Sequence, residues 1–73
     1  MEEKIIRVIA EVLKIDAKNI RRETRIADVE EWDSLMALMV LSRLKEELGV
    51  DIPIDKALTM ETVSDYIDCA EGK

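Results

Sequence analysis

The chain has 73 residues and a formal net charge of −6, and we expect residues 1–73 to form a single small domain. Hydrophobic residues make up 48% of the sequence, aromatic residues only 3%, and there are just two glycines and one proline. This aliphatic, turn-poor composition predicts an all-α fold. Cys69 is the only cysteine and there is no histidine, which excludes an internal disulfide and removes the usual general base of catalysis.

The distribution of charge and hydropathy narrows the function classes. The longest apolar run, residues 35–41, is far shorter than the roughly 20 residues that cross a bilayer. The first residues lack the basic and apolar regions of a signal peptide, so we expect a cytoplasmic protein. Residues 1–25 carry seven basic and five acidic side chains, whereas residues 26–73 carry four basic and twelve acidic ones. An acidic surface suits a protein partner with a basic face and disfavours nucleic acid.

The first predicted element is a helix over residues 3–14. Its apolar residues Ile5, Ile9, Val12 and Leu13 recur at helical spacing, with charged residues on the other side. Residues 15–33 have no regular period and contain one turn at 16–19, so they predict a long loop. Loops of this length in compact domains tend to be functional. Its apolar residues are expected to anchor it to the bundle: Ile15, Ile20, Ile26 and Val29.

The second predicted helix spans residues 34–48. Asp33 precedes it as a candidate N-cap, and Gly49 follows it where a left-handed C-terminal cap is favoured. The pattern predicts a buried stripe of Leu35, Leu38, Leu41 (or Val40), Leu44 and Leu48.

The remaining chain predicts an extended segment, a short helix and a last helix. Pro53 favours extended backbone over residues 50–54, and Asp55 can cap a short helix that runs through Leu58. Thr62 and Asp65 resemble a capping box that opens a helix ending near residue 71. The fold expected is an antiparallel bundle of three main helices and one short helix, with a long loop after the first. The apolar face of the last helix is expected to hold Val63, Tyr66, Ile67 and Ala70, and Cys69 is expected to lie off that face.

Ser34 is the candidate functional residue. It opens the second helix, where unpaired backbone N–H groups and the helix dipole favour a phosphate group. We expect its hydroxyl to point outward while Leu35 turns in and packs against the core. Serine and aspartate are also common at helix starts purely as caps, so the Asp33-Ser34 pair alone does not establish a function.

The wider sequence resembles the acyl and peptidyl carrier proteins. Trp32-Asp33-Ser34-Leu35 at a helix start is similar to their Asp-Ser-Leu motif. The likeness extends to the long loop with Thr24 and Ile26, to residues 48–53 after the second helix, and to residues 60–63 before the last. The resemblance therefore covers most of the chain. The order of these segments along the chain identifies the family more specifically than the Asp-Ser-Leu motif alone.

This resemblance implies that Ser34 is modified with 4′-phosphopantetheine by a phosphopantetheinyl transferase, which uses coenzyme A and its own magnesium ion. The thiol of the arm then holds an acyl group as a thioester, so the reactive chemistry belongs to the cofactor. The resemblance also implies that Asp33 supports the transferase contact and that Leu35 packs at the base of the arm. The chain would be a monomeric carrier, not an enzyme, served by acyl-loading enzymes and acyl-using synthases.

Three residues depart from the carriers of fatty-acid synthesis. Those carriers usually have acidic residues at the positions of Met36 and Met39, and a small residue at the position of Trp32. Trp32 is closer to peptidyl and D-alanyl carriers. If all three side chains are exposed, they form an apolar docking patch beside Ser34. The alternative is that one or both methionines complete the core.

Acidic residues form a second candidate docking surface. Asp28, Glu30, Glu31 and Asp33 precede Ser34, and they suit a solvated loop, a basic partner or a weak divalent-cation site. Their spacing does not match an EF-hand loop. Glu46 and Glu47 are expected to extend the acidic surface along the far end of the second helix.

Three rival functions stay open. An aminoacyl, peptidyl or D-alanyl carrier is supported by Trp32. An unmodified helical adaptor could bind a protein partner through the second helix, although the intact Asp33-Ser34-Leu35 argues against it. An enzyme is the weakest rival, because the sequence shows no nucleophile–base pair.

Overall fold

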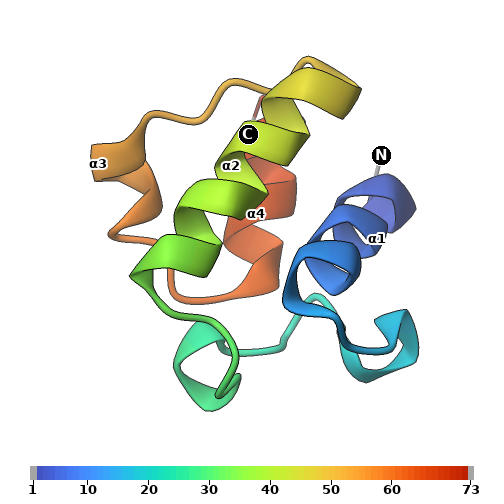
Figure 1. Cartoon of the computed structure of the whole chain (residues 1–73). Coiled ribbons are helices and arrows are strands. Elements are labelled where there is room, and N and C mark those ends of the chain that lie inside the picture. The colour runs from blue at the N-terminus through green and yellow to red at the C-terminus, as the bar shows by residue number, and fades with distance from the viewer. Residues whose placement is uncertain (1, 73) are drawn as a thin grey trace.

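The computed structural model describes residues 2–72 and is helical (Figure 1). Its elements in chain order are α1 (Glu2–Leu13), the 3₁₀ helices η1 (Ala17–Asn19) and η2 (Ile26–Asp28), α2 (Ser34–Leu48), α3 (Ile54–Ala57) and α4 (Val63–Ala70). The all-α prediction is confirmed, and each main helix begins and ends within about one residue of its predicted bounds. The long loop holds two short helical turns, of which the pattern had indicated only the first. No helix within residues 2–72 has the length and apolar character needed to span a membrane.

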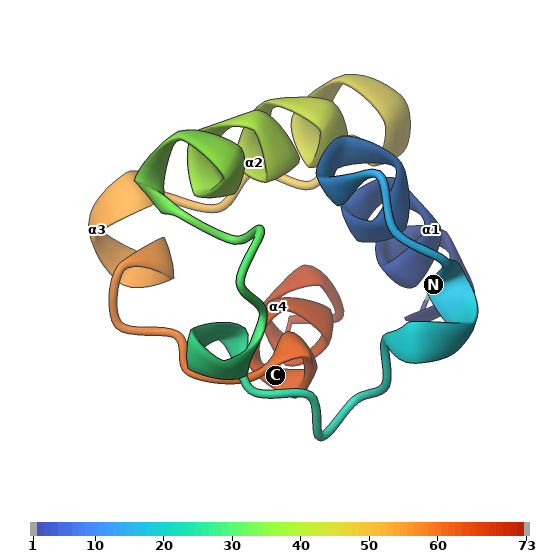
Figure 2. The same cartoon turned by 60° about the horizontal axis from the view of Figure 1, so that its bottom comes forward.

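The helices surround one apolar core. In Figure 1, α2 lies in front with α1 to its right, α3 to its left and α4 behind it, and α1 runs in the opposite direction to α2 and α4. The extended segment after Gly49 and the short α3 carry the chain back, so α4 runs in the same direction as α2. Turned forward, the loop after α1 crosses the open end of the bundle (Figure 2). The largest fully buried side chains come from all three main helices: Ile5, Ile9, Val40, Leu44, Val63, Tyr66 and Ile67.

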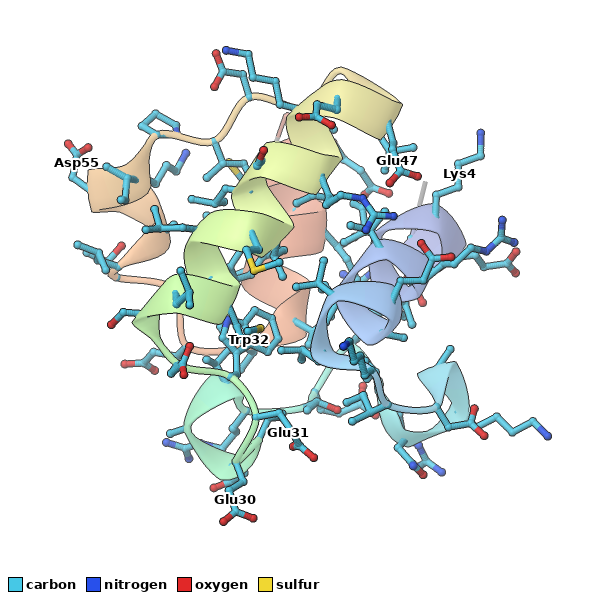
Figure 3. All side chains as sticks on the ribbon, viewed as in Figure 1. Lys4, Glu30, Glu31, Trp32, Glu47 and Asp55 are labelled. Carbon is cyan, nitrogen blue, oxygen red and sulfur yellow. The ribbon has the colours of Figure 1, made fainter. Side chains whose placement is uncertain are left out.

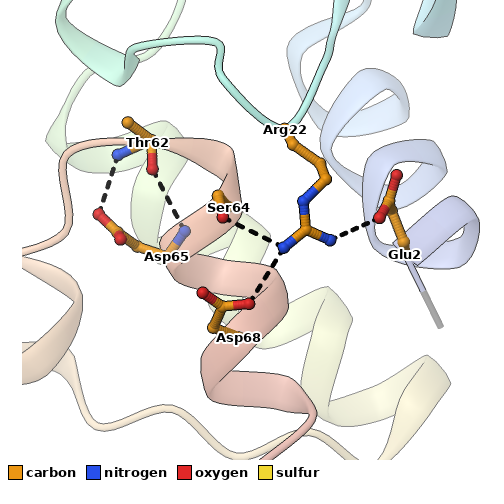
Figure 4. Close-up of polar contacts among 6 residues, drawn as sticks. All are labelled: Glu2, Arg22, Thr62, Ser64, Asp65 and Asp68. Carbon is orange, nitrogen blue, oxygen red and sulfur yellow. Dashed lines mark hydrogen bonds and ion pairs between the residues drawn. The ribbon is translucent and has the colours of Figure 1, made fainter. Parts of the chain in front are cut away.

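The loop between α1 and α2 is held in place by apolar and polar contacts. Ile20 is buried, and the other three predicted anchors are partly buried against the core. The backbone also pairs with the start of α4, where the Ile26 N–H donates to the carbonyl of Glu61 at 2.8 Å. Arg22 then joins the loop to two helices: its guanidinium donates to Glu2 of α1 at 2.6 Å and to Asp68 of α4 at 3.1 Å (Figure 4).

The caps of the helices follow the sequence with one correction. The Asp33 carboxylate caps α2, Gly49 ends it in the left-handed conformation at φ 68°, and Thr62 with Asp65 forms the capping box of α4. Asp55 does not cap α3, because that helix already begins at Ile54 and has Pro53 at the cap position without a side-chain bond. The fixed φ of proline suits the residue that leads into a helix.

The buried stripe of α2 differs from the prediction. Val40 and Leu44 are fully buried, whereas Leu35 and Leu38 are 61% and 46% exposed. Residues 35–41 of this helix are apolar on every side, so the contact with α1 sets which side faces inward. Cys69 also differs from expectation, because its side chain is half-buried against the core.

Candidate functional site

Ser34 is the first residue of α2 and is exposed. The preceding Asp33 has extended backbone, with φ −109° and ψ −174°, and its Oδ1 accepts a hydrogen bond from the Met36 N–H at 2.8 Å. The first intrahelical bond runs from the Ala37 N–H to the Asp33 carbonyl at 2.9 Å. The Ser34 hydroxyl therefore stands at the positive end of a fifteen-residue helix whose start is fixed by a cap.

Two clefts open beside Ser34. The smaller, about 80 Å³, lies between α2 and α3 and has almost purely apolar walls, including Leu38, Leu41 and Ile54. The larger, about 330 Å³, lies below the first turn of α2 and is lined by Trp32, Met60 and Tyr66 among others. A group attached to Ser34 can thus reach an apolar cleft or a mixed one.

Trp32 belongs to the core, so the exposure on which the apolar docking patch depends is not met at this residue. Its side chain is only 8% exposed, and its ring lies 5.5 Å from that of Tyr66 at an angle of 49°. Figure 3 shows it below the first turn of α2, turned into the molecule. Burial raises the pKa of the Tyr66 phenol, so this wall of the larger cleft stays uncharged. The predicted patch of Trp32, Met36 and Met39 therefore does not form as proposed.

The two methionines have different environments. Met36 is half-buried against the core, while Met39 is 44% exposed. Leu35 and Met39 are four residues apart on one face of α2, and Leu35 is also exposed. This contradicts the expectation that Leu35 turns in. The exposed apolar surface near Ser34 also includes residues whose exposure the sequence did not indicate: Leu38 on α2, and Ile54 and Leu58 at α3.

The acidic residues fall into two separate groups. Glu30 and Glu31 are exposed and extend away from the loop before α2 (Figure 3). Glu46 and Glu47 are exposed at the other end of α2, about 18 Å away along the helix axis. Glu47 pairs with Arg43, whose guanidinium also donates to Glu11 at 2.9 Å.

The structure therefore does not bring all the predicted docking residues together. Within residues 2–72, no cluster of three or more histidine, cysteine or acidic side chains is placed to hold a metal ion.

The geometry fits a phosphate-linked group on Ser34. The hydroxyl is exposed, the helix start favours negative charge, and a mobile chain leaving the serine has two clefts beside it.

Comparison with known proteins agrees with this geometry. Residues 3–70 match the family described as "Phosphopantetheine attachment site". The chain is 32% identical over 71 residues to the acyl carrier protein of Thermosynechococcus vestitus. The matched segment spans 97% of this chain and 88% of that protein. It is 36% identical over 67 residues to the acyl carrier proteins of Rickettsia canadensis and Rickettsia typhi. That segment spans 92% of this chain and 78% of each relative. This chain belongs to the acyl carrier protein family, whose members are carriers and whose cofactor is covalently attached 4′-phosphopantetheine.

Proposed function

We propose that Ser34 carries the 4′-phosphopantetheine arm and that the chain delivers acyl groups, held on the arm as thioesters, to partner enzymes of fatty-acid, lipid or polyketide-type synthesis. The proposal includes residues 1–73 acting as one monomeric carrier domain in the cytoplasm. The observation that carries it is the exposed Ser34 hydroxyl at the capped start of α2, beside two clefts.

The residues around Ser34 have separate tasks in this function. Asp33 fixes the helix start through its bond to the Met36 N–H, and the N–H groups of that first turn favour the phosphate of the arm. Leu35 is 61% exposed beside the serine, so it is available to the base of the arm and to the transferase. The bound arm supplies a thiol that forms thioesters, and the chain supplies the surface that partner enzymes recognise.

The test is the intact mass of the protein after incubation with coenzyme A, magnesium and a broad-specificity phosphopantetheinyl transferase. We expect the wild type to gain one phosphopantetheine and Ser34→Ala to gain none. Ser42→Ala is the matched control, because Ser42 is an exposed serine on the same helix, and it should be modified like the wild type. If folded wild-type protein gains no mass while a known carrier is modified in parallel, the carrier function is wrong and the unmodified adaptor takes its place.

An aminoacyl or D-alanyl carrier is the second candidate, favoured by the tryptophan before the Asp33-Ser34 pair. Modified protein offered to acyl and aminoacyl ligases separates the two. Thioester formation with an amino acid and none with a fatty acid would assign the chain to the second class.

A further inference from the structure

The indole N–H of Trp32 is a buried hydrogen-bond donor without an acceptor. Tryptophan offers this one donor and no acceptor, and a buried indole usually finds a partner. Here the side chain is 8% exposed, and within residues 2–72 the nitrogen is the only buried side-chain nitrogen or oxygen left without a hydrogen bond. Solvent does not reach it either. Such a group in a small core calls for an explanation.

The position of the indole connects this donor with Ser34. Trp32 and Ser34 line the same 330 Å³ cleft, two residues apart in the chain. The attachment point of the arm and the side chain that holds the unused donor thus share one cleft wall, while the nitrogen itself is covered. The 80 Å³ cleft that Ser34 also lines has no such group in its apolar walls, which suit an alkyl chain.

We propose that the Trp32 N–H recognises a carbonyl oxygen of the group carried on Ser34, and so positions that group in the larger cleft. The oxygen belongs either to an amide of the arm or to the acyl cargo. This inference rests on the proposed attachment at Ser34. Because the nitrogen is covered, the oxygen reaches it only when the covering atoms move. The cleft wall can adjust, because it includes the 72% exposed Leu58 and the unbranched Met60, which change rotamer at low cost.

The competing explanation needs no ligand. The ring of Tyr66 lies close enough to Trp32 to receive the N–H on its face as a weak interaction. In that case the environment of the indole stays the same whatever Ser34 carries. The two explanations therefore predict different behaviour of one atom.

The single tryptophan makes this atom directly observable, because ¹⁵N-labelled protein gives one indole N–H signal. The signal is recorded for the unmodified protein, for the protein with the bare arm, and for butyryl and 3-oxobutyryl thioesters. A downfield shift of the indole proton on adding the arm assigns the bond to an arm carbonyl, and a shift only after acylation assigns it to the cargo. An unchanged signal in all states overturns the proposal. Mass confirms loading first, so failure of Ser34 attachment is recognised separately.

A variant gives a second, functional readout. Trp32→Phe keeps an aromatic ring and removes the donor, with the fold checked by circular dichroism. A typical net hydrogen bond corresponds to about a fivefold change in population. We expect the 3-oxobutyryl thioester of Trp32→Phe to hydrolyse up to about fivefold faster, because the cargo spends less time in the cleft. Ser42→Ala, an exposed position on the same helix that lines neither cleft, serves as the control. Equal hydrolysis in Trp32→Phe and wild type, with an unmoved indole signal, would reject the bond.

Discussion

At the scale of single residues, two leucines of α2 differ in burial and therefore in role. Leu44 is fully buried, and Leu35 is 61% exposed beside Ser34. Leu44→Ala should lower the free energy of unfolding by about 2–5 kcal/mol, because it leaves a cavity in a close-packed core. Leu35→Ala should change it by less than about 0.5 kcal/mol but slow the modification of Ser34, since that side chain is free to contact the transferase.

Urea denaturation of both variants, followed by timed transferase reactions on the folded ones, measures the two effects. An unfolding free energy of Leu35→Ala as low as that of Leu44→Ala would place Leu35 in the core and contradict the exposure. Normal modification of Leu35→Ala would remove it from the transferase contact.

The residue scale is also where the sequence predicts least. Asp33 and Ser34 could be identified because a cap and a helix start are local features. The environments of Trp32, Met36 and Leu35 could not, because an apolar run such as 35–41 permits several helix faces to be buried. The choice is made by the packing of α2 on α1, and by Tyr66, which lies 34 positions along the chain from Trp32 and packs against it.

At the scale of elements, α4 depends on its capping box. The Asp65 carboxylate accepts hydrogen bonds from the backbone N–H groups of Glu61, at 2.8 Å, and Thr62, at 3.1 Å. These bonds, first that of Glu61 and then that of Thr62, lower the pKa of Asp65 despite some burial. A carboxyl with a lowered pKa in the folded state stabilises the protein above its unfolded pKa of about 3.9 and loses that effect as the pH falls through the folded value.

We therefore expect Asp65→Asn to lower the free energy of unfolding by about 1 kcal/mol at pH 7, the usual size of a capping interaction. The difference from wild type should shrink below about pH 4, where the wild-type carboxyl also becomes neutral. Thermal unfolding from pH 7 to pH 2.5 measures this. Asp55→Asn is the control, since Asp55 is exposed and makes no cap, and should match wild type within about 0.5 kcal/mol. A difference for Asp65→Asn that stays constant with pH would show that charge is not the cause.

Elements were predicted well because their signals are local. The caps of α2 and α4 and the glycine after Leu48 mark helix ends directly, and three strong apolar periods mark the helices between them. The start of α3 was misplaced because a four-residue helix has too few residues to show a period, so Asp55 looked like a cap. The turn η2 gave no signal of its own. It is fixed by the backbone pairing of Ile26 with Glu61, a contact between distant parts of the chain.

At the scale of the whole molecule, the first turns of α2 after Asp33 form an uncharged surface on an acidic protein. The net charge is −6, yet residues 34–42, which include Ser34, carry no charged side chain. Their exposed side chains include Leu35, Leu38 and Met39. We expect a partner enzyme to meet an apolar surface at the serine, with the exposed Glu30 and Glu31 at its edge. Apolar contact supplies affinity that depends little on salt, whereas the acidic edge acts through screened charges.

Met39→Glu tests the apolar part of this surface. Met39 is exposed, so the variant should fold, whereas Met36→Glu would place a charge in the half-buried wall of the helix. We expect Met39→Glu to raise the KM of the transferase or loading enzyme about fivefold or more, as for a contact worth about 1 kcal/mol. Lys45→Gln makes the same change in net charge at the far end of α2 and should leave KM near its wild-type value.

Salt distinguishes the two parts of the surface. If apolar contact dominates, the ratio of the Met39→Glu and wild-type KM values is nearly the same at 50 mM and 500 mM sodium chloride, because the lost contact is not electrostatic. If the partner instead binds through Glu30 and Glu31, the wild-type KM rises steeply with salt. The double variant Glu30→Gln and Glu31→Gln then has a similarly raised KM already at low salt. An unchanged KM for Met39→Glu together with such a rise would transfer recognition from the helix to the loop before it. The partner of this carrier would then have a basic docking face, as the acidic net charge alone suggests.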